Sequence, residues 1–199
     1  DYQSTMGDQN LTLAEANFSG LWDRTAIGIG GGASGGHSGR LGGNKNRLVG
    51  RYRGRGTLSV VELALAWLAR NQEPDGHWDT AKFGAEVKTD TACTGFALLA
   101  FLGAGHTERI GNYKENVRRA VAWLKSKQNA EGLVFDPTDA GAHRGIGYPH
   151  SIAGMALAEA AGMGGVPDTM RAAQKAVDYS VNVHQSGSGY DRRGFRYQA

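Results

Sequence analysis

The sequence predicts an all-α protein built from repeated helix–helix units. Three observations lead to this prediction. One helix-and-turn pattern recurs at a constant offset of 56, a second helical pattern recurs at an offset of 59, and apolar residues follow helical spacing within both. Self-similarity at a fixed period of this length is typical of stacked supersecondary units. We therefore expect helical hairpins that share one core.

The first pattern runs through residues 58–78, LSVVELALAWLARNQEPDGHW. Ser59 and Glu62 have the spacing of a capping box, which predicts a helix over about 59–72. A proline, an aspartate and Gly76 then turn the chain, and a tryptophan follows two residues later.

Two later segments repeat this pattern. Gln128 and Gly132 are the counterparts of Gln72 and Gly76 at the offset of 56, while Val134 takes the place of the tryptophan. The preceding helix is expected over about 113–128, with an asparagine at position 112 as its cap.

The third copy keeps an alanine and an aromatic residue at the same spacing. Its helix is expected from Pro167 to about residue 184, and its glutamine, Gln185, comes one residue late. A Gly-x-aromatic ending follows only at 194–197, after a stretch of serine and glycine.

The second pattern predicts two further helices, over about 90–102 (DTACTGFALLAFL) and about 150–161 (HSIAGMALAEAA). The first of these is apolar nearly all round, which is typical of a helix buried on every side. Gly95 and Gly154 lower helix stability, so we expect each to allow close packing against a neighbouring helix.

The segment 1–56 differs sharply from the rest. Glycine dominates 28–43, and the basic residues that follow up to Arg55 have no acidic neighbour. This composition predicts a flexible arm over 1–56, followed by the helical domain over 57–199. The GGGASG stretch at 30–35 fits a dinucleotide-binding pattern but lacks its strand and helix. We expect the arm to act as a linker or to lie on a neighbouring subunit.

Composition excludes few classes of protein. A length of 199 residues supports one domain, and Cys93, the only cysteine, cannot form an internal disulfide. No apolar run reaches the roughly 20 residues that span a bilayer, so no membrane span is expected. The net charge of +3 is mild, and nucleic acid is not favoured as a partner.

The combination of Leu68, Gln72, Gly76 and Trp78 resembles the QW repeat of squalene and hopene cyclases and of the related prenyltransferase β-subunits. Among these, the chain is most similar to bacterial proteins with prenyltransferase and squalene oxidase repeats. The resemblance covers about residues 57–197. It implies an α/α toroid, in which the glutamine and tryptophan tie the end of one outer helix to the start of the next.

In such a toroid, the three glutamine-ended helices would be outer and the two apolar helices inner. The chain then supplies only part of a ring, and a partial ring leaves apolar faces uncovered at its ends. We therefore expect further copies of the chain, other protein subunits or the rest of a longer chain to cover them, with the arm as one candidate cover.

Two activities of the resembled enzymes can be compared with the residues. Class II cyclases protonate an alkene with the central aspartate of D-x-D-D-T-A. The matching stretch here ends in Asp90, Thr91 and Ala92, but Thr89 stands at the donor position, and a threonine cannot supply a strong acid's proton. Cyclase activity is therefore not expected.

Prenyltransferase β-subunits hold a catalytic zinc with an aspartate and a cysteine near the start of one inner helix and a histidine near the start of a later one. Asp90, Cys93 and His150 are the matching residues, and their side chains suit zinc. The family spacing is Asp-x-Cys, whereas this chain has Asp-x-x-Cys. The alternatives are a helix N-terminal aspartate, a core cysteine and a capping histidine.

From these comparisons we expect a non-catalytic repeat domain that serves binding or assembly. The alternative is a fragment of an isoprenoid-related enzyme, zinc prenyltransferase-like before cyclase-like. No residue pattern identifies a ligand or a cellular compartment.

Overall fold

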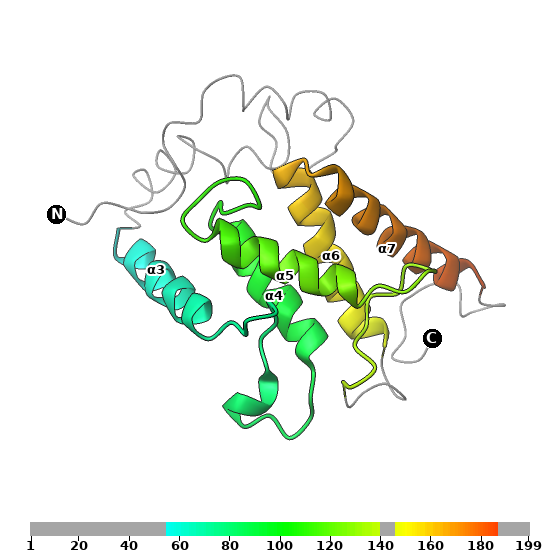
Figure 1. The fold of residues 1–199 in the computed structure, drawn as a ribbon, viewed down its shortest axis with the longest axis horizontal. Coiled ribbons are helices and arrows are strands. Elements are labelled where there is room, and N and C mark those ends of the chain that lie inside the picture. The colour runs from blue at the N-terminus through cyan, green and yellow to red at the C-terminus, as the bar shows by residue number, and fades with distance from the viewer. Residues whose placement is uncertain (1–54, 140–145, 187–199) are drawn as a thin grey trace.

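The structure is a computed structural model that describes residues 55–139 and 146–186. This part of the chain contains five α-helices, one short 3₁₀ helix and no strand (Figure 1), which confirms the all-α prediction. The elements in chain order are α3 (Arg55–Arg70), η2 (Thr80–Phe83), α4 (Asp90–Gly103), α5 (Lys114–Ser126), α6 (Gly147–Gly164) and α7 (Pro167–Ser186).

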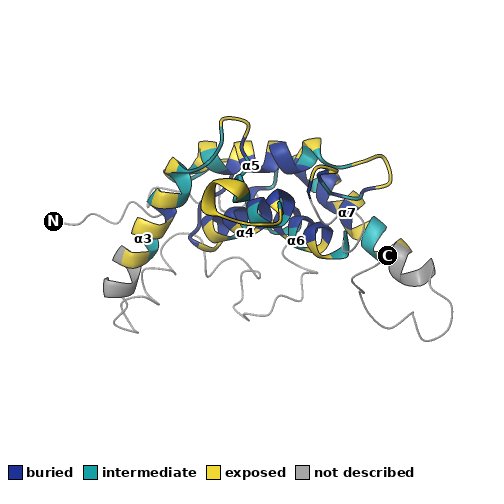
Figure 2. Ribbon diagram, turned by 90° about the horizontal axis from the view of Figure 1, so that it is seen from below, coloured by how far each residue is buried: buried dark blue, intermediate teal, exposed yellow. Residues whose placement is uncertain are grey.

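The helices form two layers. Helix α4 packs against α6 and α5, and α6 packs against α7. Figure 2 shows α5 and α7 on one side of this arrangement and α4 with α6 on the other, while α3 lies at the edge. We call α3, α5 and α7 the outer layer and α4 and α6 the inner layer.

The two inner helices run in the same direction. At their N-terminal end, Asp139 in the loop before α6 accepts the backbone N–H groups of Asp90 and Thr91 in the first turn of α4. At their C-terminal end, Gly164 of α6 lies beside Glu108, which follows α4. Equivalent positions of α4 and α6 are therefore side by side.

The core lies between the layers. Both layers contribute large, fully buried side chains, with Leu98 and Phe101 on α4, Leu124 on α5 and Leu157 on α6. Full burial of a side chain of this size stabilises a fold by about 1.5–3 kcal/mol. The helical spacing of these residues is what places them on facing sides.

Gly95 allows the inner helices to approach closely, as predicted. A Cβ added at Gly95 of α4 would lie 2.9 Å from Cγ2 of Ile152 in α6. Gly154 is less crowded, because a Cβ there would lie 3.5 Å from Cβ of Ala176 in α7, an ordinary contact distance.

Several predicted helix ends are wrong. Helix α3 begins at Arg55, so Ser59 lies inside it and cannot be its cap, and the predicted arm loses its last two residues to the helix. Helix α5 begins at Lys114, so Tyr113 rather than the predicted Asn112 stands at the N-cap position, and the Tyr113 side chain makes no capping hydrogen bond.

Helix α6 is longer than the predicted 150–161. It begins at Gly147, because Pro149 can occupy the first turn of a helix, where its missing N–H costs no hydrogen bond. It continues to Gly164 and ends where Gly165 takes the left-handed conformation, with a φ of 60°.

The prediction that the helix over 90–102, α4, is buried on every side is also wrong. Phe96 of α4 is 57% exposed and Met155 of α6 is 54% exposed. The offset of 59 relates these two residues, so they occupy equivalent positions on the two helices. The apolar residues all round these helices therefore serve a core on one side and an uncovered face on the other.

Some predictions lie outside the described residues. These are the arm over 1–54 and the Gly-x-aromatic ending at 194–197. Within the described ranges, no helix has both the length and the hydropathy that crossing a bilayer requires.

Candidate functional site

Gln72 ties the end of α3 to the start of α5. Its Nε2 donates to the carbonyl oxygens of Gly76 and Asn116, each at 2.9 Å. Its Oε1 accepts from Nδ2 of Asn116 at 2.7 Å and from a guanidinium nitrogen of Arg119 at 2.8 Å. The glutamine therefore joins its own turn to the first part of the next outer helix.

Gln128 makes the same pair of contacts one repeat later. Its Nε2 donates to the carbonyl oxygens of Gly132 at 3.2 Å and of Ala172, in α7, at 2.9 Å. Each glutamine bonds a glycine four residues on and a backbone carbonyl 44 residues on. The third glutamine, Gln185, lies in α7, but its side chain is outside the described part of the chain.

The glycines of both turns meet the next helix so closely that no side chain fits. Gly76 has a φ of 109°, and an added Cβ would lie 2.3 Å from the carbonyl oxygen of Arg119. Gly132 has a φ of 103°, and its added Cβ would lie 2.1 Å from the carbonyl oxygen of Lys175. Glycine is required at both positions for its conformation and for its lack of volume.

Trp78 and Val134 follow these glycines and fill equivalent places in the core, one in each repeat. Trp78 is 2% exposed, and its Nε1 donates to the carbonyl of Leu68 at 2.9 Å. The backbone N–H of Trp78 donates to Oγ1 of Thr94 at 3.2 Å. In the second copy, the backbone N–H of Val134 donates to Nδ1 of His150 at 3.1 Å. In both pairs the acceptor comes 16 residues after the donor in the sequence. His150 is therefore the counterpart of Thr94 in this contact.

His150 is therefore bonded at both ring nitrogens. Its Nε2 lies 3.0 Å from Oγ of Ser180, and its ring meets Tyr179 edge-on at 4.8 Å between centroids. Burial lowers the pKa of His150, and a backbone contact with Ala176 only partly offsets this. The neutral imidazole fits its role, because Nδ1 must be unprotonated to accept a hydrogen bond.

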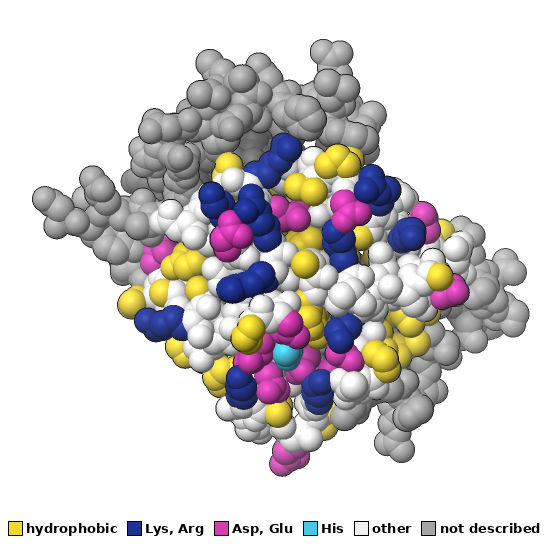
Figure 3. All heavy atoms as spheres, viewed as in Figure 1, with side chains coloured by type: hydrophobic (Ala, Val, Ile, Leu, Met, Phe, Trp, Pro, Cys, Tyr) yellow, Lys and Arg dark blue, Asp and Glu magenta, His cyan; other side chains and the backbone are white. Residues whose placement is uncertain are grey.

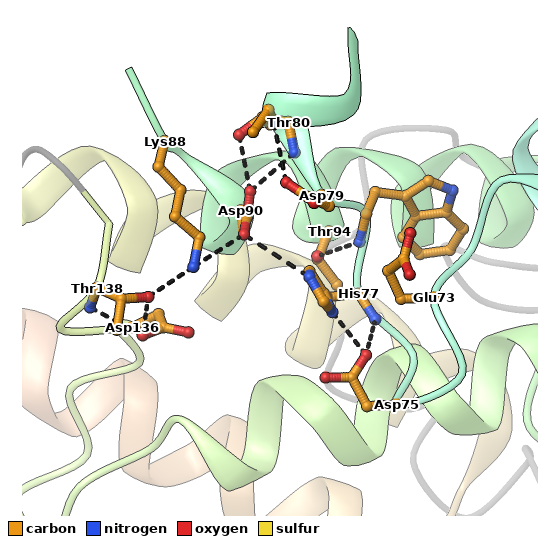
Figure 4. A network of polar contacts seen from close by, with 12 residues as sticks. Glu73, Asp75, His77, Asp79, Thr80, Lys88, Asp90, Thr94, Asp136 and Thr138 are labelled. Carbon is orange, nitrogen blue, oxygen red and sulfur yellow. Dashed lines mark hydrogen bonds and ion pairs between the residues drawn. The ribbon is translucent and has the colours of Figure 1, made fainter. Parts of the chain in front are cut away.

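A group of polar side chains surrounds the first turn of α4, and we call it the α4 cluster (Figure 4). At its centre is Asp90, whose side chain is fully buried. Its Oδ1 accepts from the backbone N–H of Thr80 at 2.9 Å and from the hydroxyl of Thr80 at 2.7 Å. Its Oδ2 lies 3.2 Å from Nζ of Lys88 and 3.7 Å from Nε2 of His77, whose Nδ1 is 2.6 Å from Asp75.

The loop before α6 completes the cluster from the other side. Asp136 accepts the N–H and hydroxyl of Thr138, each at 2.9 Å, and pairs with Nζ of Lys127 at 2.8 Å. Burial raises the pKa of Asp136, but these bonds outweigh burial and hold its pKa at about 2. Its own N–H donates to the hydroxyl of Thr91 at 3.0 Å. The cluster therefore fastens two loops to the start of α4.

The predicted zinc ligands are not grouped in this arrangement. Asp90 takes part in the α4 cluster, and His150 is bonded to Val134 and Ser180. Cys93 is a free, half-buried thiol whose pKa is raised by burial and by the nearby charge of Asp90. Among the described residues, no three His, Cys, Asp or Glu side chains lie together as metal ligands. As placed, these residues do not form a zinc site, and the expectation that the chain has no cofactor stays a prediction.

The exposed and partly exposed residues of α4 and α6 form a second candidate site, which we call the inner face. Glu159 is its only charged side chain. Its larger members are apolar or aromatic and include Phe96, Leu99, Tyr148, Ile152 and Met155. The opposite, outer face carries Lys and Arg beside Asp and Glu (Figure 3).

Sequence reasoning missed both the α4 cluster and the inner face. The cluster joins residues from three separate segments, so no local motif marks it. The inner face had a signal in the equivalence of Phe96 and Met155, but apolar residues on all sides of both helices concealed which side was uncovered.

Comparison of this chain with protein-family models, with curated proteins and with solved structures finds no match.

Proposed function

We propose that this chain is a non-catalytic helical repeat domain of the prenyltransferase and squalene oxidase type, which assembles with further copies of itself through the inner face. The observation that carries this proposal is the lack of charge on that face: of all exposed or partly exposed residues of α4 and α6, one is charged.

The outer layer supplies the comparison. Helix α5 exposes Lys114, Glu115, Arg118 and Arg119, as a helix facing water commonly does. On the inner face, Phe96 and Met155 are each more than half exposed. Burial of the exposed part of each of these two side chains in an interface would contribute about 1 kcal/mol to the free energy of association. A face with one charged residue has little charge pattern to select a different partner, and its apolar residues can pack against the same face on a second copy.

Two observations support the toroid-type repeat. Gln72 and Gln128 make equivalent bonds at two successive junctions, and Gly76 and Gly132 make equivalent close approaches. Stacked repeats of this kind leave an apolar surface wherever the stack is incomplete.

The α4 cluster favours a structural role over a catalytic one. Oδ1 of Asp90 and both oxygens of Asp139 are occupied by groups of the chain itself. Thr89, at the position of the cyclase proton donor, immediately precedes the first residue of α4. The alternative of an isoprenoid-related enzyme therefore gains no catalytic group from this cluster.

Sedimentation velocity over a range of protein concentrations tests the proposal. We expect the wild-type chain to associate and the double variant Phe96→Lys, Met155→Lys to remain monomeric with unchanged helix content. The matched control is Ala122→Lys, Ser126→Lys, which adds the same charge to exposed positions of α5 and should associate like wild type. A wild-type chain that stays monomeric at every concentration would contradict the proposal.

A further inference from the structure

Helix α3 exposes a stripe of three large apolar side chains, separate from the inner face. Val60 is 64% exposed, Leu63 is 70% exposed and Trp67 is 45% exposed. Their spacing places them on one side of the helix. We call these residues the α3 stripe.

The equivalent stripe of α5 is covered. At the offset of 56, the counterparts of the α3 stripe are Asn116, Arg119 and Trp123. Gln72 bonds the carbonyl of Asn116, and Gly76 packs on the backbone of Arg119. The ring of the next residue, His77, stacks on Trp123 with 5.2 Å between centroids and 17° between planes.

Helix α7 repeats this arrangement. Its equivalent positions are Ala172, Lys175 and Tyr179. Gln128 bonds the carbonyl of Ala172, and an added Cβ at Gly132 would lie within 3.3 Å of Cβ of Tyr179. The turn of the preceding unit therefore covers this stripe at both junctions that the structure describes.

The sequence before α3 contains the counterpart of such a turn. At the same offset of 56, Gly20, Trp22, Asp23 and Gly28 precede Gly76, Trp78, Asp79 and Gly84. At an offset of 55, Leu13, Ala14 and Asn17 precede Leu68, Ala69 and Gln72. The segment 13–28 thus carries the pattern with one residue fewer and with asparagine in place of glutamine.

We propose that residues 13–28 of the same chain cover the α3 stripe, as the 68–84 turn covers α5. Gly20 then packs on the backbone of Leu63, and Leu21, the counterpart of His77, lies on the ring of Trp67. An apolar pair thus replaces the stacked pair of the next junction, which accounts for an apolar rather than a polar stripe on α3. This inference does not depend on assembly through the inner face.

Hydroxyl-radical footprinting of the full chain, read by mass spectrometry at Leu63 and Trp67, tests the inference. It is carried out in the Phe96→Lys, Met155→Lys background, so that assembly through the inner face does not contribute. We expect Gly20→Val to raise modification of both residues several-fold, because a valine side chain cannot fit against the helix backbone. Gly36→Val, which makes the same change in the arm outside 13–28, should leave both unchanged.

Two outcomes would overturn the inference. Equal modification in wild type and Gly20→Val would show that the segment does not cover the stripe. Protection that grows with protein concentration would show that a second copy covers it instead. By contrast, protection that is lost only in Gly20→Val and is independent of concentration would support the inference.

Discussion

Replacing Gly76 with alanine should strongly destabilise the fold, and the structure allows the size of the effect to be worked out. The backbone φ of 109° is unfavourable for alanine and costs of order 1–3 kcal/mol. The new Cβ would also lie 2.3 Å from the carbonyl oxygen of Arg119, about 1 Å inside normal contact. The turn must therefore move away from α5.

That movement separates Gln72 from Asn116, since Gln72 bonds both the turn and the helix. Each lost hydrogen bond costs about 0.5–1.5 kcal/mol. We expect a total loss of about 2–4 kcal/mol, which in a chain of this size lowers Tm by roughly 2–4 °C for each kcal/mol.

Urea denaturation followed by circular dichroism measures this change, and two glycines provide controls. Gly84 also has a positive φ, 79°, but an added Cβ would meet nothing within 4 Å, so Gly84→Ala should show the conformational cost alone. Gly103 is helical with open space around it, so Gly103→Ala should stabilise by about 0.5–1 kcal/mol. If Gly76→Ala costs no more than Gly84→Ala, the assigned contact between turn and helix is wrong.

Three further predictions concern titration and metal binding. The lowered pKa of His150 means that the unfolded chain takes up its proton first, so wild-type stability should fall as the pH falls below 6.5, and urea titrations of His150→Asn should show a flatter dependence. The lowered pKa of Asp136 contributes stability that is complete above pH 3.8 and is lost as the pH falls towards 2. In thermal melts, Asp136→Asn should therefore be less stable than wild type by about 1–2 kcal/mol of unfolding free energy at neutral pH, and the two proteins should become equally stable in acid. Metal analysis of the purified chain should find no stoichiometric zinc, whereas zinc that is present and is lost in both Cys93→Ser and His150→Ala would favour the enzyme alternative.

The positions of the helices could be predicted because their apolar spacing and their recurrence at two constant offsets can be read directly from the sequence. The ends of the helices were harder to predict. Ser59 and Glu62 have capping-box spacing, yet Arg55 to Leu58 contain no proline, so the helix extends backwards past the proposed cap.

The role of His150 shows why site predictions are harder. Its residue type and its place in the first turn of an inner helix suit a zinc ligand. Its actual partners, Val134 and Ser180, come from a loop and from another helix, and no local pattern specifies them. The sequence did hold one signal, because His150 occupies the position that corresponds to Thr94, a residue able to accept a hydrogen bond. The two donors, Trp78 and Val134, are such different residues that the sequence does not show that their backbone N–H groups make equivalent bonds.

The inner face can be tested most directly through Cys93, the only cysteine of the chain, which is half-buried on α4 three residues before Phe96. The measurement is the rate at which a thiol reagent labels Cys93 at fixed alkaline pH, as protein concentration rises. If copies assemble through the inner face, the rate should fall over the concentration range in which the sedimentation coefficient rises, and Phe96→Lys, Met155→Lys should abolish both changes. A labelling rate that stays constant while the chain associates would contradict the account, because the interface would then lie elsewhere.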